Sequence, residues 1–176
     1  MRMLFVNPAL SDDFSTLDIG LTTLATYINE RSDHVAGIAD LTFHRRYWKR
    51  RLNEQIRRFE PDIIGMPSNT MHMQYVREVA AEIASAQGIP IVLGGHHASI
   101  HPDDALRTPG VRAIVRGDGE KPLITLLDRE GPEGCGESVP GLWWTRRDGR
   151  VVATPGGSFE PDLNVLPTPN YDLWED

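Results

Sequence analysis

The strongest constraint on the fold is the alternation of short apolar runs with segments of helical periodicity over the first two-thirds of the chain. The apolar runs are too short for helices and are bounded by Pro, Gly or Asn, a pattern typical of buried strands. The strand candidates are RMLFVNP (2–8), HVAGIADL (34–41), DIIGMPS (62–68), PIVLGG (90–95) and VRAIVRGDGE (111–120). The chain is therefore expected to build a sheet whose strands are separated by helices.

Helices are predicted where apolar residues recur every three or four positions, as at Leu17, Leu21, Leu24 and Ile28. The predicted helices cover 17–28, 48–59, 76–83 and 103–107, and a last one is opened by Pro122. Strands that alternate with helices pair in parallel through right-handed crossovers. The predicted fold class is α/β: a doubly wound, Rossmann-like or flavodoxin-like, five-stranded parallel sheet with strand order 2-1-3-4-5.

The last quarter of the chain has a different pattern. GPEGCGE (131–137) indicates a surface loop, and LWWTRRDGRVVATP (142–155) predicts a β-hairpin around Asp148-Gly149. Trp143 and Trp144 are adjacent on a predicted strand, so they should face opposite sides, one packed on the domain and one exposed or covering a partner. DLNVLPTPNYDLWED (162–176) is proline-punctuated and is interpreted as a linker rather than an element. The expected domains are 1–134, a loop and hairpin over 135–157, and a linker over 158–176.

Charge and cysteine content exclude several classes of function. The formal net charge of -7 argues against nucleic-acid binding, and the basic segment HRRYWKRRLNEQIRR (44–58) is interpreted as the solvated face of a surface helix. No apolar run approaches the roughly 18–20 residues that span a membrane, and the N-terminus lacks the pattern of a secretory signal. The single cysteine, Cys135, excludes an intrachain disulfide and any site that needs several cysteines of this chain, and it favours a cytoplasmic location.

The carboxyl ends of parallel strands meet at one edge of a sheet, where ligands of open α/β folds bind. The five predicted strand ends are Asn7-Pro8, Asp40-Leu41, Pro67 to Thr70, Gly94 to His97 and Gly117 to Glu120. Three of them are small or glycine-rich, which suits a broad ligand that lies close to the backbone. Each also has a purely structural interpretation: a tight turn at Gly94-Gly95, a helix cap within Ser68 to Thr70, and a carboxylate at a helix start for Glu120.

Three histidines, His96, His97 and His101, lie within six positions after the glycine pair. Adjacent residues point in different directions, so convergence of all three on one metal ion is disfavoured. A single histidine packed against a flat ligand is favoured instead. A general base would need a nucleophile that the sequence does not reveal. The sequence contains neither a GxGxxG motif after the first strand nor a GxxxxGK[ST] motif. Nucleotide binding through either of these loops is therefore not supported.

An ordered series of segments resembles the N-terminal cobalamin-binding domain of the cobalamin-dependent radical SAM enzymes. The segments are PDIIGMPSNT, PIVLGGHHASIHPDDAL, VRAIVRGDGEKPLITLL, VPGLWWTRRDGRVVATP and DLNVLPTPNYDLWED. The resemblance implies that cobalamin lies over the carboxyl ends of the strands and faces a radical SAM barrel in the same chain. By position it implies these cofactor contacts: Asn7, Pro8, Ser68, Asn69, Thr70, Met71, Gly94, Gly95, His96, His97, Ser99, Gly117, Asp118, Gly119 and Glu120.

Two departures refine these expectations. The D-x-H-x-x-G motif of other cobalamin proteins is absent, so cobalamin is expected without a histidine lower ligand and with its nucleotide tail displaced from cobalt. The CxxxCxxC motif that holds a [4Fe–4S] cluster is also absent, because Cys135 stands alone. The cluster and S-adenosylmethionine would therefore belong to a downstream domain, and residues 1–176 are interpreted as a fragment that cannot run radical chemistry by itself.

Three functions are weighed from the sequence. The favoured one is the cobalamin module of a radical SAM methyltransferase, with cyclisation or rearrangement as other outcomes of the parent enzyme. The second is a flavodoxin-like domain that binds another flat cofactor such as flavin, or a non-catalytic partner-binding domain. The third is a stand-alone metal-dependent enzyme that uses the histidine cluster.

Overall fold

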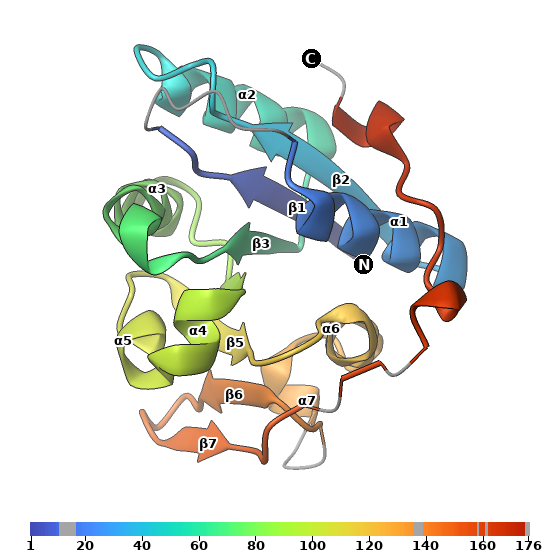
Figure 1. Ribbon diagram of the computed structural model, residues 1–176. Coiled ribbons are helices and arrows are strands. Elements are labelled where there is room, and N and C mark those ends of the chain that lie inside the picture. Colours follow the sequence, from blue (N-terminus) through green and yellow to red (C-terminus); the bar gives the residue numbers. More distant parts are fainter. Residues whose placement is uncertain (11–16, 136–138, 158, 161, 175–176) are drawn as a thin grey trace.

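The computed structural model describes residues 1–10, 17–135, 139–157, 159–160 and 162–174, and its centre is a sheet of order β2-β1-β3-β4-β5-β6-β7 (Figure 1). The strands are β1 (Arg2–Asn7), β2 (Val35–Asp40), β3 (Ile63–Pro67), β4 (Ile91–Gly94), β5 (Val111–Val115), β6 (Leu142–Thr145) and β7 (Val151–Ala153). Strands β1 to β5 pair in parallel. The predicted fold class and the strand order 2-1-3-4-5 are therefore confirmed, but the expected count of five strands is wrong because the hairpin strands join the same sheet and make seven.

Helices cover both faces of the sheet and enclose two apolar cores. The helices are α1 (Ile19–Arg31), α2 (Trp48–Phe59), α3 (Met73–Ala86), α4 (His96–Ile100), α5 (Pro102–Leu106), α6 (Glu120–Asp128) and α7 (Pro132–Cys135), with 3₁₀ helices η1 (Thr70–His72), η2 (Leu163–Val165) and η3 (Tyr171–Trp174). One core lies under α2, α3, α4 and α5, and the other lies under α1, α6 and α7. None of the helices in the described ranges is both long and apolar enough to cross a membrane.

Helix α2 shows how a strongly basic segment joins this fold. Trp48, Leu52 and Ile56 recur every four residues and are buried against the sheet. Basic residues between them, such as Lys49 and Arg50, are exposed. The prediction that this segment is the solvated face of a surface helix is confirmed.

The β-hairpin extends the central sheet by two antiparallel strands, with β6 hydrogen-bonded to β5. Trp144 is 1% exposed and belongs to the core that lies under α1, α6 and α7. Trp143 packs against the core on the other face of the sheet, and the Arg116 guanidinium lies over its ring. The two rings face opposite sides, as predicted. The expectation that one of them is exposed is wrong, because Trp143 is half-buried and donates from Nε1 to the Thr154 carbonyl, whereas contact of this ring with a partner stays a prediction.

The C-terminal third is more ordered than the sequence predicted. Part of the expected 131–137 loop forms α7, where Cys135 is buried; residues 136 and 137 lie outside the described residues. The stretch 162–176, predicted to hold no element, contains η2 and η3, and residues 175 and 176 are again outside the description. In Figure 1 this red segment runs alongside α1.

Candidate functional site

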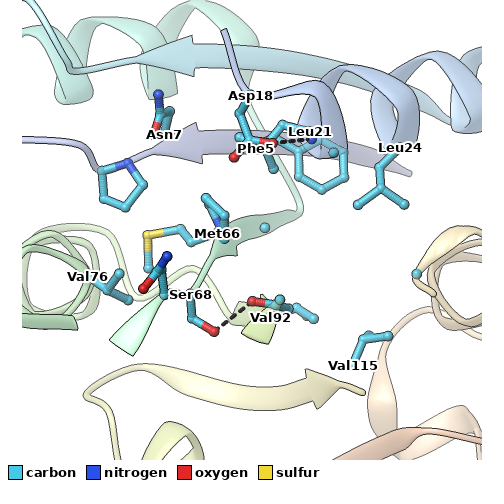
Figure 2. Close-up of a pocket in the computed structure, with 18 of the residues that line it drawn as sticks. Phe5, Asn7, Asp18, Leu21, Leu24, Met66, Ser68, Val76, Val92 and Val115 are labelled. Carbon is cyan, nitrogen blue, oxygen red and sulfur yellow. Dashed lines mark hydrogen bonds between the residues drawn. The ribbon is translucent and has the colours of Figure 1, made fainter. Parts of the chain in front are cut away.

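A cavity of about 580 Å³ opens at the carboxyl ends of β1, β3 and β4 and continues down the side of the sheet that α1 and α6 cover (Figure 2). The predicted strand edge is therefore hollow in the structure. The predicted site residues that line the cavity are Asn7, Pro8, Ser68, Asn69, Gly94, Gly95, His96, Gly117 and Gly119. The other predicted residues, Thr70, Met71, His97, Ser99, Asp118 and Glu120, lie outside its lining.

The rim of the cavity is built largely from backbone. The Ser68 hydroxyl donates to the Gly94 carbonyl at 2.6 Å and accepts from the Ala98 amide at 3.1 Å. The Ser68 carbonyl accepts from the His97 amide at 3.0 Å. These bonds tie the end of β3 to the start of α4, and Ser68 is only 2% exposed. Its hydroxyl therefore holds the rim together.

Gly94 and Gly95 leave the rim low for different reasons. A Cβ at Gly94 would meet no atom closer than 4.0 Å, so the space above this residue is open. Gly95 has φ of +93°, a conformation that L side chains rarely adopt, and a Cβ there would stand 3.0 Å from the Ser68 carbonyl oxygen. The glycine pair thus combines an open position with a close backbone contact at a positive φ that favours glycine.

Helix α1 forms one wall of the cavity. Asp18 caps the helix by accepting from the Leu21 amide at 2.9 Å, and both residues line the cavity. Sequence reasoning missed this wall because the rule for open α/β sheets points to strand ends and says nothing about the helix that follows the first strand. The available signal was the position of α1 directly after the β1 end.

The lower part of the cavity is apolar, and we call it the apolar slot. Its walls are Phe5, Leu21, Leu24, Val92, Val115 and Leu123. In Figure 2, Phe5 and Leu24 stand on one side of this space, and Val92 and Val115 stand on the other. Gly65 pairs with Phe5 in register, and a Cβ on Gly65 would lie 2.6 Å from the Phe5 ring. Gly65 therefore allows that ring to lie against β3.

His97 is held by the protein and does not line the cavity. It is 4% exposed, with Nδ1 at 3.1 Å from the Thr70 hydroxyl and Nε2 at 2.9 Å from Asp104 Oδ2. The hydrogen bond with His97 is the main reason that the pKa of Asp104 lies below its usual range, and the Arg77 guanidinium adds to it. This network joins α4 and α5 to η1 through Thr70 and to α3 through Arg77.

The remaining predicted residues surround the cavity without lining it. Met71 is 82% exposed beside the rim. Ser99 donates to the Gly95 carbonyl at 3.0 Å and accepts from the Gly117 amide at 3.4 Å, so it joins two strand ends. Asp118 and Glu120 face a second cavity between α1, α6 and the C-terminal segment. Burial, followed by the charges of Asp118 and Glu160, raises the pKa of Glu120.

The three histidines of the cluster have different surroundings in the structure. His96 is exposed and lines the cavity, His97 is buried, and the rings of His97 and His101 lie 5.2 Å apart between centroids. Within the described ranges, no three or more His, Cys, Asp or Glu side chains are grouped so that they could hold a metal ion.

Two curated proteins are similar to this chain over most of its length. An uncharacterized methyltransferase of Pyrococcus horikoshii is 30% identical over 161 residues, which cover 88% of this chain and 33% of that protein. The anaerobic magnesium-protoporphyrin IX monomethyl ester cyclase of Rubrivivax gelatinosus is 33% identical over 130 residues, 70% of this chain and 23% of the cyclase. The chain thus spans a third or less of the length of these relatives.

A solved structure is similar over most of the chain. The radical S-adenosylmethionine methyltransferase TsrM of Kitasatospora setae, determined with cobalamin and a [4Fe-4S] cluster bound, matches with a TM-score of 0.74 and 26% identity. The match covers 88% of this chain and 30% of TsrM. The model of the B12 binding domain family matches residues 10–127, which include most of the rim and every wall residue of the apolar slot except Phe5. The chain therefore belongs to the B12-binding domain family.

Proposed function

We propose that this chain is the cobalamin-binding module of a cobalamin-dependent radical SAM enzyme, and that the whole protein is a methyltransferase. Family membership and the names of the relatives support this proposal. The similarity to a cyclase leaves cyclisation as the other reaction of the parent enzyme. Bound cobalamin supplies a cobalt centre that can carry a methyl group. The roles described next belong to residues of this chain.

The rim fits a corrin ring, which is a broad disc edged with amide groups. The open space above Gly94 admits a flat ligand close to the backbone, and Ser68 keeps the two strand ends at one level. Asn7, Asn69 and His96 also line the cavity and place polar side chains around this rim. Amides of the ring edge can exchange hydrogen bonds with such groups, so the residues present suit this cofactor.

The apolar slot suits the nucleotide tail of cobalamin. The chain lacks the D-x-H-x-x-G motif, so we propose that no histidine is the lower ligand and that the tail leaves cobalt and enters the slot. The aromatic base of the tail would lie between Phe5 and Leu24 on one side and Val92 on the other. Burial of an aromatic ring against such side chains is favourable by the hydrophobic effect.

The other cofactors of the proposed enzyme would be bound elsewhere in the same chain. One cysteine, Cys135, is present, and it is buried, so we propose that a [4Fe-4S] cluster and S-adenosylmethionine bind to a radical SAM domain reached through residues 158–176. We also propose a cytoplasmic location, which the low cysteine content supports. The length of the relatives beyond the matched region supports a further domain.

The observation that carries this proposal is the joint presence of a low rim at the strand ends and an apolar slot beneath it. The test is to add hydroxocobalamin to the protein, remove the excess by gel filtration, and record the corrin absorption. We expect about one corrinoid per chain. A protein that emerges colourless would overturn the proposal, and a flavin spectrum after flavin loading would favour the alternative of another flat cofactor.

A pair of matched variants sharpens the test. Gly94→Val places a side chain on the rim where the corrin would lie, and the nearest atom to the new Cβ is the Val115 carbonyl oxygen at 4.0 Å. Gly156→Val makes the same change at an exposed glycine whose Cβ would meet nothing within 4 Å. We expect Gly94→Val to weaken cobalamin binding at least about tenfold and Gly156→Val to leave it unchanged.

A further inference from the structure

Below the rim, the walls of the apolar slot are formed by apolar side chains. Phe5, Val92 and Val115 come from three strands, and each is 3% exposed or less although it lines a cavity. Leu21 and Leu24 of α1 and Leu123 of α6 complete the walls. These six side chains are hydrocarbon, and the thioether side chains of Met3 and Met66 also line the cavity.

Three polar side chains that line this cavity, those of Ser68, Asp18 and Asn7, are already hydrogen-bonded within the protein. The Ser68 hydroxyl bonds to the Gly94 carbonyl, and Asp18 accepts from the Leu21 amide at the start of α1. Asn7 donates to Asp40 and to Thr42 on the neighbouring strand end. The strand backbones behind Phe5, Gly65 and Val92 are in register, so their amides and carbonyls belong to the sheet. A base in the slot would therefore meet hydrocarbon on its sides.

Resting on the proposed function, we infer that the apolar slot selects among corrinoids by the base of their nucleotide tail. It accepts dimethylbenzimidazole and rejects adenine. Dimethylbenzimidazole presents two methyl groups and a single free ring nitrogen to its surroundings. Adenine presents an exocyclic amine and several ring nitrogens, each of which loses its hydrogen bonds to water on entering the slot. A buried polar group without a partner is costly, and a hydrocarbon wall offers none.

Val92 is the position where this selectivity can be changed with the least disturbance. It stands on the wall opposite Phe5 and Leu24 (Figure 2), and Val→Thr keeps its shape while adding a hydroxyl that can bond to the edge of a purine. Val111, also buried and also at the start of the β4–β5 pairing, faces the other core. Val111→Thr therefore adds the same hydroxyl away from the slot.

The experiment measures dissociation constants of the 176-residue chain for three corrinoids by absorption titration. They are cobalamin, the cobamide with an adenine base, and cobinamide, which lacks the nucleotide. We expect cobalamin to bind at least about tenfold more tightly than either of the others, as one unpaired buried polar group or the loss of the buried base would produce. We expect Val92→Thr to reduce the preference for cobalamin over the adenine cobamide at least about threefold, and Val111→Thr to leave it unchanged.

The outcomes separate this inference from the function on which it rests. Binding of none of the three corrinoids would overturn the proposed function and this inference with it. Tight binding of all three with similar affinity would overturn the inference alone, because the corrin would then bind without use of the slot. The comparison on the unmodified chain decides the matter even if Val92→Thr fails to fold.

Discussion

Ser68 and Gly95 lie so close together that a side chain at position 95 would be crowded: a Cβ there would stand 3.0 Å from the Ser68 carbonyl oxygen and 3.3 Å from its amide nitrogen. Both of these atoms belong to backbone that is fixed by hydrogen bonds, from the His97 amide to the Ser68 carbonyl and from the Ser68 amide to the Gly94 carbonyl. To relieve this crowding, the end of β3 and the start of α4 would have to move apart by a few tenths of an ångström. The height of the rim therefore depends on glycine at this position.

We expect Gly95→Ala to lower the free energy of unfolding by about 3 kcal/mol, because it adds this crowding to a φ of +93° that alanine rarely adopts. Gly88→Ala is the matched control, since Gly88 has φ of +65° but a Cβ there would meet no atom within 4 Å. Its expected cost is about 1 kcal/mol from the backbone alone. Urea unfolding measures both. Equal costs for the two variants would contradict the role given to the Ser68 contact.

His96 and His97 are adjacent but should respond to alanine in opposite ways. His97→Ala removes a buried ring that bonds to Thr70 and Asp104, and we expect it to lower stability by about 2–3 kcal/mol. His96→Ala changes an exposed side chain on the cavity rim, so we expect a stability change within about 0.5 kcal/mol and a several-fold weaker affinity for hydroxocobalamin. Thermal unfolding measures the stability of both variants, and absorption titration measures their affinity for hydroxocobalamin. A large stability loss in His96→Ala, with His97→Ala as stable as the unmodified chain, would contradict this assignment.

The fold was largely predictable from sequence because each strand and most helices carry their own periodic pattern. Helix α4 was missed for a physical reason. It has five residues, it follows Gly95, and no side chain caps it, so its sequence carries no helix signal of its own. Its start is held by tertiary hydrogen bonds from the Ala98 and His97 amides to Ser68, a residue of the β3 end that lies far away in the chain.

The rim of the site was predictable and the apolar slot was not. Glycines and small polar residues at strand ends mark a ligand edge, and Gly94 and Gly95 are found there. Phe5, Val92 and Val115 are the same kinds of residue that fill a packed core, so the sequence does not distinguish a cavity wall from a filled interior. Likewise, which of two adjacent histidines points inward depends on the orientation of α4, and that orientation is set by contacts outside the helix.

Glu120 gives a prediction about pH. Burial first, and then the charges of Asp118 and Glu160, raise its pKa in the folded protein. A raised carboxyl pKa means that the fold favours the protonated form, so stability should fall as pH rises from the ordinary Glu value through the raised one. Glu120→Gln cannot ionise. Its stability relative to the unmodified chain should therefore be greater at about pH 7 than at about pH 4, by roughly 1 kcal/mol or less.

Urea unfolding at the two pH values measures this difference, with Glu30→Gln as the control at an exposed position of α1. A Glu120→Gln variant whose relative stability fell between about pH 4 and pH 7 would show that the charged form of Glu120 is stabilised by the fold, contrary to the burial described above.

The C-terminal segment is joined to the cavity through α1. Trp174 donates from Nε1 to the Thr22 hydroxyl at 2.8 Å, and the same hydroxyl donates at 2.7 Å to the carbonyl of Asp18, which lines the cavity. A residue that bonds to both sites couples them, and such coupling acts equally in both directions. Cobalamin should therefore slow hydrogen exchange in the peptide that covers 162–174, and loss of the Thr22 hydroxyl should weaken cobalamin binding.

We expect Thr22→Val to lower stability by about 1–2 kcal/mol, because the Trp174 indole N–H loses its partner, and to raise the dissociation constant for hydroxocobalamin a few-fold. Thr125→Val is the matched control: its hydroxyl makes the same bond to the carbonyl four residues earlier, on Lys121, but it holds no part of the C-terminal segment. Hydrogen exchange and absorption titration read the two effects separately. If Thr22→Val frees residues 162–174 while cobalamin affinity stays unchanged, the segment is held on α1 without coupling to the cavity, since a coupling energy must be visible from both sites.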